Sequence, residues 1–161
     1  AGTTPRAARK DALWEASRMV SALHEKLYVD DDVRFTIGMI TLEPNVPSVI
    51  ASRALFSIDI RHPDSVLLEQ LASDVNNICK DQVISCDVKA WRIAEAESIN
   101  FPSKIINLVE SISNKLGIPN TRIFSGAGHD ARQLHFVCPT YIKMVVASTL
   151  ARPTNKFGRV F

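Results

Sequence analysis

The sequence predicts an α+β fold, with a split β-α-β unit over residues 1–94 followed by a partial α/β segment over residues 95–161. Apolar residues recur at helical spacing in some stretches and alternate with polar residues in others, and turn-forming residues separate the stretches. In the first part the order is helix, strand, strand, helix, strand. Such a unit closes as an antiparallel sheet with both helices on one face, and a first strand just before Ala1 would complete it.

Two helices are expected in the first part and two in the second. Apolar residues between Pro5 and Leu27 fall on one helical face, and Thr4 precedes a proline at the first helical position, which is a helix-start pattern. A later stripe is followed by Gly117 and Pro119, which favour a helix end. The predicted helical ranges are residues 5–27, 67–78, 105–116 and 131–136.

Strands are indicated by alternation. The clearest one covers residues 49–61, where Phe56, Ile58 and Ile60 alternate with polar residues that include Asp59 and Arg61. An antiparallel sheet with an unpaired edge favours pairing with a second copy, so we expect a homodimer. The other predicted strands are residues 33–39, 84–93 and 142–146, with a turn at residues 43–47.

Composition excludes several classes of protein. The chain has 161 residues, 46% of them hydrophobic and 22% charged, as in a soluble globular protein. A net charge of +2 without a basic run argues against nucleic acid, and no apolar stretch is long enough to span a membrane. The cysteines Cys79, Cys86 and Cys138 are odd in number and lack CxxC spacing, which favours reduced thiols in the cytoplasm. Because Ala1 replaces an initiator Met, we expect the chain to derive from a longer protein.

Residues 125–130 read Ser-Gly-Ala-Gly-His-Asp and form the most informative loop. Its two glycines permit unusual dihedrals and close approach to a ligand, and an imidazole and a carboxylate follow at once. His129 could donate to a developing oxyanion, with the Gly128 N–H as a second donor. The alternative is a structural loop in which Asp130 caps a helix and His129 is half exposed. The spacing fits neither GxGxxG nor a P-loop.

Arg61 is a candidate for carboxylate binding. It ends a predicted strand on the polar face, and a guanidinium on a rigid strand matches a carboxylate with two parallel hydrogen bonds. The alternative is a surface ion pair with Asp59 or Asp64.

The sequence does not predict a metal site within this chain. A catalytic zinc ion needs about three protein ligands. The four histidines are scattered and form no HExxH or HxD cluster; they are His24, His62, His129 and His135. Nucleophilic catalysis is also not predicted, because Ser125 lacks a GxSxG elbow and Cys138 is separated from His135 by a predicted helix end.

Three stretches resemble the N-carbamoyl-amino-acid and allantoate amidohydrolase branch of the zinc-dependent exopeptidase/aminoacylase superfamily. The matching stretches are Ala1–Pro5 with Arg9, Asp11, Ala12 and Leu13; Pro44–Ile50 with Phe56–Arg61; and Ser125–Ala131. The resemblance implies that residues 1–94 are a lid and dimerisation domain without its first strand. It further implies that residues 95–161 are the C-terminal part of a catalytic α/β domain.

The resemblance also implies roles for three residues. Arg61 would hold the substrate carboxylate, while Gly128 and His129 would contact the substrate near the scissile amide, His129 in a catalytic role. The parent enzyme would use two divalent metal ions, zinc or manganese, with none bound by this chain alone, and would form a homodimer through the lid. Its substrates would be N-carbamoyl amino acids or ureido acids such as allantoate.

Some positions depart from the family pattern. Ser48 replaces an asparagine that contacts substrate, the lid histidine would fall before Ala1, and residues 141–161 contain no histidine to bind metal. We therefore expect this chain to be inactive by itself. Two alternatives stay open at this point: a non-catalytic dimerisation module that retains the lid fold, and a small-ligand-binding regulatory domain that uses the loop at Gly126–His129.

Overall fold

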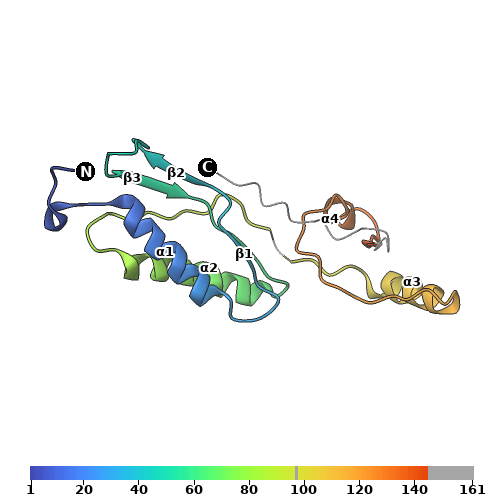
Figure 1. Ribbon diagram of the computed structural model, residues 1–161. Coiled ribbons are helices and arrows are strands. Elements are labelled where there is room, and N and C mark those ends of the chain that lie inside the picture. Colours follow the sequence, from blue (N-terminus) through green and yellow to red (C-terminus); the bar gives the residue numbers. More distant parts are fainter. Residues whose placement is uncertain (97, 145–161) are drawn as a thin grey trace. The chain divides into compact units, whose positions relative to one another are not determined.

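The computed structural model describes residues 1–96 and 98–144, and its helices and strands confirm the predicted α+β class (Figure 1). The chain divides into two units. Unit 1 comprises Ala1–Ile99 and Arg122–Ala127, and unit 2 comprises Asn100–Thr121 and the chain from Gly128 on. Unit 1 therefore takes in a segment that the sequence assigned to the second part. The assignment of residues 1–94 to a lid and 95–161 to a catalytic domain stays a prediction.

Unit 1 contains two long helices, α1 (Ala12–Leu27) and α2 (Ser65–Gln82). The predicted start of the first helix at Thr4 was wrong, because that region forms only the short 3-10 helix η1 (Arg6–Ala8). The side chain of Asp11 accepts from the backbone N–H of Trp14 at 3.1 Å and so caps α1. Asp64 caps α2 in the same way, accepting from Val66 N at 2.7 Å.

The strands pair as two short antiparallel ladders. Strand β1 (Arg34–Thr36) pairs with β4 (Asp59–Arg61), and β2 (Ile40–Glu43) pairs with β3 (Arg53–Phe56). The continuous strand predicted for residues 49–61 is thus divided into β3 and β4. The strand predicted for residues 33–39 ends at Thr36, and β2 begins beyond the predicted range. The Ser57 N–H donates to the Met39 carbonyl at 3.0 Å between the ladders, so the interrupted strands stay connected.

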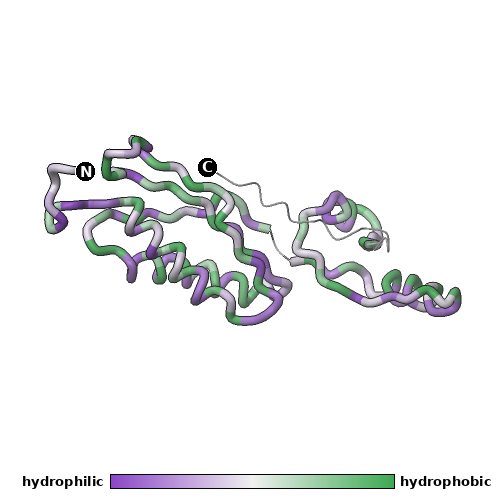
Figure 2. The backbone as a smooth tube through the Cα atoms, viewed as in Figure 1, coloured by the Kyte–Doolittle hydropathy of each residue, from purple (hydrophilic) through white to green (hydrophobic). Residues whose placement is uncertain are grey.

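The core of unit 1 lies between the two helices and the strands. Leu23 and Leu27 of α1 are 0% exposed, and Leu71 of α2 is 2% exposed. From the strands, Phe35 is buried, and partly buried residues that include Ile60 pack against the same cluster. Apolar and polar residues alternate along both helices (Figure 2), and burying one stripe of each helix is what stabilises this layer.

The strand predicted for residues 84–93 is absent from the described chain. The start of this segment instead binds Glu15, a carboxylate on α1 that is 1% exposed. Its Oε1 accepts from Ser85 N at 2.9 Å and Ser85 Oγ at 2.7 Å, and its Oε2 accepts from the N–H groups of Ile84 and Cys86, both at 3.2 Å. Because these N–H groups point at a side chain, they are not available to a neighbouring strand.

Unit 2 contains helix α3 (Ser103–Lys115) and the short helix α4 (Ala131–His135), close to the predicted ranges. Gly117 follows α3 with a φ of 68°, which suits a glycine helix end. Neither helix has a buried residue. A strand was predicted for residues 142–146. Residues 142–144 form no regular structure, and Val145 and Val146 lie outside the described residues. Across residues 1–96 and 98–144, no helix has both the length and the apolar character that crossing a membrane requires.

Candidate functional site

Arg61, at the end of β4, is held by Asp59, which lies two residues earlier on the same face of the strand. Its Nε donates to Asp59 Oδ1 at 2.9 Å and its Nη2 donates to Oδ2 at 2.6 Å. The hydrogen bond and charge of Arg61 lower the pKa of Asp59, and those of Asp59 raise the pKa of Arg61. The ion pair considered from the sequence is therefore formed, and it fixes the orientation of the guanidinium.

A loop from a distant part of the sequence also contacts Arg61. The Gly126 carbonyl accepts from Arg61 Nη1 at 2.6 Å, across 65 residues of sequence. A guanidinium has five N–H donors, and the described residues engage three of those on Arg61. Two donors thus remain at this half-exposed side chain, enough for one carboxylate, so the ion pair and carboxylate binding are compatible.

Gly126 lies against two arginines. A Cβ at this position would be 3.8 Å from Cγ of Arg34 and 3.9 Å from Cδ of Arg61, which is ordinary contact. The expectation of unusual dihedral angles at the loop glycines was wrong, because in the described ranges only Asn45 and Gly117 have a positive φ. Gly126 therefore packs against both arginine side chains, and neither its size nor its dihedral angles require a glycine at this position.

Gly128 and His129 belong to unit 2, at the start of α4. Gly128 is exposed and His129 is half-buried. The His129 carbonyl accepts from Arg132 N at 2.9 Å, which shapes the first turn of the helix. The side chain of Asp130 makes no capping hydrogen bond. Loop capping by Asp130, the structural alternative considered above, is thus not realised, and the roles of Gly128 and His129 stay predictions.

A buried histidine that the sequence did not single out supports the strand that carries Arg61. His62 is 7% exposed, with Nε2 at 3.2 Å from Asp30 Oδ2 and Nδ1 accepting from Asp64 N at 3.0 Å. Asp30 in turn accepts from Asp32 N at 2.8 Å, and this hydrogen bond, together with His62, lowers the pKa of Asp30. The imidazole therefore joins the turn before β1 to the start of α2.

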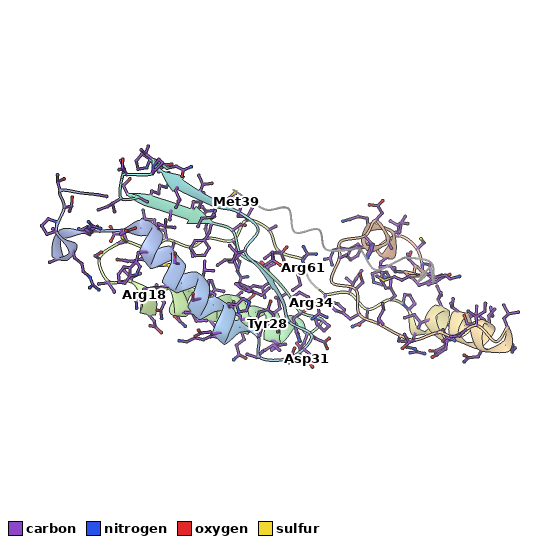
Figure 3. All side chains as sticks on the ribbon, viewed as in Figure 1. Arg18, Tyr28, Asp31, Arg34, Met39 and Arg61 are labelled. Carbon is purple, nitrogen blue, oxygen red and sulfur yellow. The ribbon has the colours of Figure 1, made fainter. Side chains whose placement is uncertain are left out.

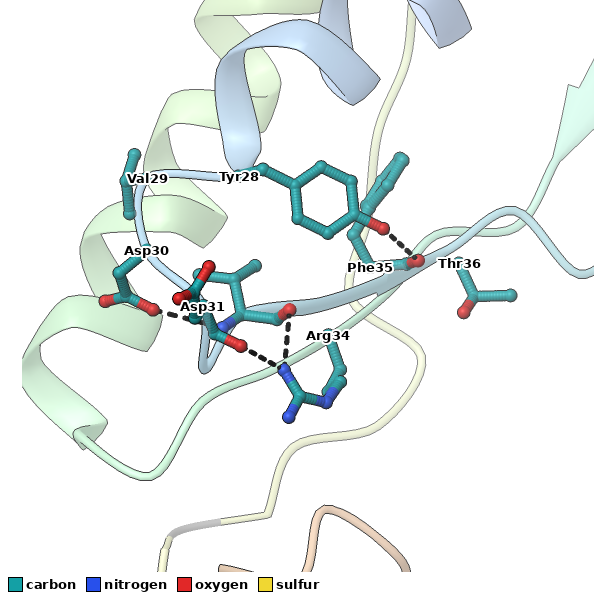
Figure 4. A pocket seen from close by; sticks show the side chains of 8 residues that line it. Tyr28, Val29, Asp30, Asp31, Arg34, Phe35 and Thr36 are labelled. Atoms are coloured by element: carbon teal, nitrogen blue, oxygen red, sulfur yellow. Dashed lines mark hydrogen bonds between the residues drawn. The ribbon is translucent and has the colours of Figure 1, made fainter.

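Arg34 is a second arginine that sequence reasoning missed. It lies directly opposite Arg61 in the register of β1 and β4, and directly opposite residues share a face of the ladder (Figure 3). Its Nη1 donates to the carbonyls of Asp31 at 2.5 Å and Val33 at 3.2 Å (Figure 4). The only signal that places Arg34 beside Arg61 is the strand register, which a single sequence does not reveal.

The turn leading into β1 surrounds an open depression of about 530 Å³ (Figure 4). Arg34 lines it together with Tyr28, whose hydroxyl donates to the Phe35 carbonyl at 3.2 Å. The remaining lining residues are Val29, Asp30, Asp31, Val33, Phe35 and Thr36.

The described part of the chain does not assemble a metal centre. Within residues 1–96 and 98–144, no three His, Cys, Asp or Glu side chains lie close enough to hold an ion. The described residues of this chain therefore do not fit a metal site by themselves.

Comparisons with known proteins agree with the resemblance. No family model matches the chain. It is 37% identical over 142 residues to an allantoate amidohydrolase of Bacillus subtilis (strain 168), covering 83% of this chain and 33% of the relative. It is 29% identical over 112 residues to an N-carbamoyl-L-amino-acid amidohydrolase of Rhizobium meliloti, covering 67% of this chain and 26% of the relative.

A solved structure gives the same result for the fold. An amidase of the hydantoinase/carbamoylase family from Burkholderia multivorans superposes with a TM-score of 0.75 at 35% identity, covering 87% of this chain and 35% of that one. The chain thus spans between a quarter and a third of the length of these two curated relatives. It is a homologue of the allantoate and N-carbamoyl-L-amino-acid amidohydrolases, the branch that its sequence motifs resemble.

Proposed function

We propose that this chain is part of a metal-dependent amidohydrolase that cleaves the linear C–N bond of N-carbamoyl amino acids or of ureido acids such as allantoate. One observation carries the proposal: Arg61, held by Asp59 and by the Gly126 carbonyl, keeps two N–H donors for a carboxylate. Homologues named as amidohydrolases of such acids support this substrate class.

Within the proposed enzyme, the residues of this chain bind and orient the substrate. Arg61 holds the substrate carboxylate, and Asp59 keeps the guanidinium in one orientation. The Gly128 N–H and His129 donate to the oxygen that gains negative charge as the amide is attacked. Two divalent ions, zinc or manganese, would supply the activated water when bound by residues other than those described here. A cytoplasmic location stays a prediction of the sequence.

The alternative is a non-catalytic dimerisation module that retains the lid fold. The hydrophobic core of unit 1 favours this second candidate, since both helices and the strands contribute to one buried cluster, while apolar side chains such as Val66 and Ile40 stay exposed for contact with a second copy. In either case we propose a homodimer formed through unit 1. A strictly monomeric mass in solution would contradict the proposed homodimer.

The test compares two forms of the protein with the same substrates. The 161-residue chain and the natural-length gene product that contains it are assayed with N-carbamoyl amino acids and allantoate, each with added zinc or manganese. We expect turnover only from the natural-length product. Turnover by the short chain would contradict its assignment as a part of the active site, and inactivity of both forms would favour the dimerisation module.

A substitution in the natural-length product tests the role of Arg61. We expect Arg61→Gln to raise KM about tenfold or more, because it removes charge-assisted hydrogen bonds to the substrate. Arg53→Gln is the matched control, since Arg53 is an exposed arginine on β3 that pairs with Glu43 at 3.3 Å. Equal KM values for the Arg61 variant and the control would refute the assignment.

A further inference from the structure

We propose that Arg34 is a second carboxylate-binding residue, which shares one ligand carboxylate with Arg61. This inference rests on the proposed function for the identity of the ligand. Both side chains flank Gly126, at 3.8 Å for Cγ of Arg34 and 3.9 Å for Cδ of Arg61 from the point where a Cβ would lie. The site therefore consists of two guanidinium groups on one face of the β1–β4 ladder, next to the loop at Gly126.

The strand register brings the two arginines together. Arg34 and Arg61 are directly opposite partners in an antiparallel ladder. Like charges in this position repel each other and destabilise the pairing. Asp59 neutralises Arg61, but within the described ranges no carboxylate lies within ion-pair distance of Arg34. An anion bound between the two arginines would compensate the remaining positive charge, that of Arg34.

The two guanidinium groups differ in which of their donors the protein uses. A carboxylate is best held by the edge of a guanidinium that carries Nε and one Nη. On Arg61 that edge is occupied by Asp59. On Arg34 the hydrogen bonds to described residues all come from Nη1, which leaves Nε and Nη2 for a ligand. Arg34 thus offers the bidentate edge that Arg61 has already used.

Charge decides the class of ligand. Arg34, Arg61 and Asp59 together carry one excess positive charge, which matches a single carboxylate rather than two. Among the described residues, no carboxylate of the neighbouring acidic turn pairs with Arg34, and Asp30 is engaged by Asp32 N, Val33 N and His62. The site therefore fits a monocarboxylate whose other groups are neutral, as in a ureido or carbamoyl derivative of a neutral amino acid.

The experiment measures binding separately from turnover. The full 161-residue chain, labelled with 15N, is titrated with N-carbamoylglycine and with its uncharged analogue N-carbamoylglycinamide, and the arginine Nε–H signals are followed by NMR. In the unaltered chain we expect the Nε–H signal of Arg34 to shift with the acid and to stay in place with the amide. Absence of any response to the acid would overturn the proposal.

Variants separate a ligand contact from a structural role. We expect Arg34→Gln to raise the Kd for the acid about tenfold, and Arg34→Lys to raise it less, because lysine keeps the charge but loses the fork. Arg53→Gln is the control and should leave the Kd unchanged. Retention of the native amide spectrum in each variant excludes unfolding as the cause.

The outcomes also distinguish this inference from the proposed function. If Arg34→Gln binds the acid as tightly as the unaltered chain, the two-arginine site is refuted while Arg61 alone can still serve the enzyme. If binding depends on Arg34 but the natural-length product hydrolyses no carbamoyl or ureido acid, the site is supported and the hydrolase assignment fails.

Discussion

Replacement of Glu15 by glutamine tests what holds the segment after α2 against α1. The change keeps the size of the side chain but converts one acceptor oxygen into an NH2 donor. Oε1 and Oε2 each accept two hydrogen bonds, the latter from Ile84 N and Cys86 N at 3.2 Å. Whichever oxygen is replaced, two donors lose their acceptor. At about 1–2 kcal/mol for each unsatisfied partly buried group, Glu15→Gln should lower the free energy of unfolding by about 2–4 kcal/mol.

Acid should remove the same stabilisation from the unaltered protein. Burial raises the pKa of Glu15, but hydrogen bonds from Ser85, Ile84 and Cys86 outweigh it, so the net pKa is lowered below the ordinary value of 4.5. The contribution is therefore complete above the unfolded-state pKa and is lost as the pH falls through the folded-state pKa. The glutamine variant should lack this part of the pH dependence.

Urea unfolding followed by tryptophan fluorescence measures both effects. Both tryptophans, Trp14 and Trp91, belong to unit 1, so the signal reports on the unit that contains Glu15. Glu25→Gln, on an exposed position of the same helix, is the control and should change stability by less than about 0.5 kcal/mol. If the Glu15 and Glu25 variants have equal midpoints at pH 7, the carboxylate does not anchor the segment.

Two further predictions concern packing and backbone conformation. Leu23→Ala should destabilise unit 1 by about 2–5 kcal/mol, since Leu23 is 0% exposed. The control Leu108→Ala, at a position 58% exposed, should cost under about 0.5 kcal/mol. Urea unfolding midpoints followed by circular dichroism check both values. Gly117→Ala should lower the free energy of unfolding by about 1 kcal/mol, because the φ of Gly117 is 68°. Gly126→Ala should leave the melting temperature nearly unchanged, because Gly126 has a negative φ and room for a Cβ. Equal melting temperatures for the two glycine variants would contradict the conformational argument.

The helices were predictable from sequence because each has an apolar stripe, but the start of the first was not. Thr4 followed by proline is a common helix-start pattern, yet Asp11 is the residue whose carboxylate reaches an N–H of the first turn. The strand expected for residues 84–93 shows a different limit. Apolar and polar residues do alternate there, but Glu15 binds the first N–H groups of the segment. No local pattern predicts a partner about 70 residues away in the sequence.

The candidate site was predictable only in part. Arg61 could be identified because alternation placed it on the polar face beside Asp59, and the structure confirms that placement. Arg34 could not, because its relation to Arg61 depends on strand register. The contact between Arg61 and Gly126 was equally hidden, since it joins two distant segments of sequence. Alternation in one sequence thus identifies the polar face of a strand, but it does not identify the residues of other strands and loops that lie on the same face.

The contact between Arg61 and Gly126 has a consequence for how the loop docks. The chain leaves unit 1 after Ile99 and returns at Arg122. Closing an excursion of this length costs about 3 kcal/mol of entropy, while one hydrogen bond contributes about 1 kcal/mol. That hydrogen bond alone therefore cannot hold the loop against the strands. A carboxylate that binds the arginines more tightly when the loop at Gly126 is docked would stabilise the docked loop. Ligand binding and loop docking would then be thermodynamically linked. Amide hydrogen exchange at residues 122–127 would then slow as the site fills.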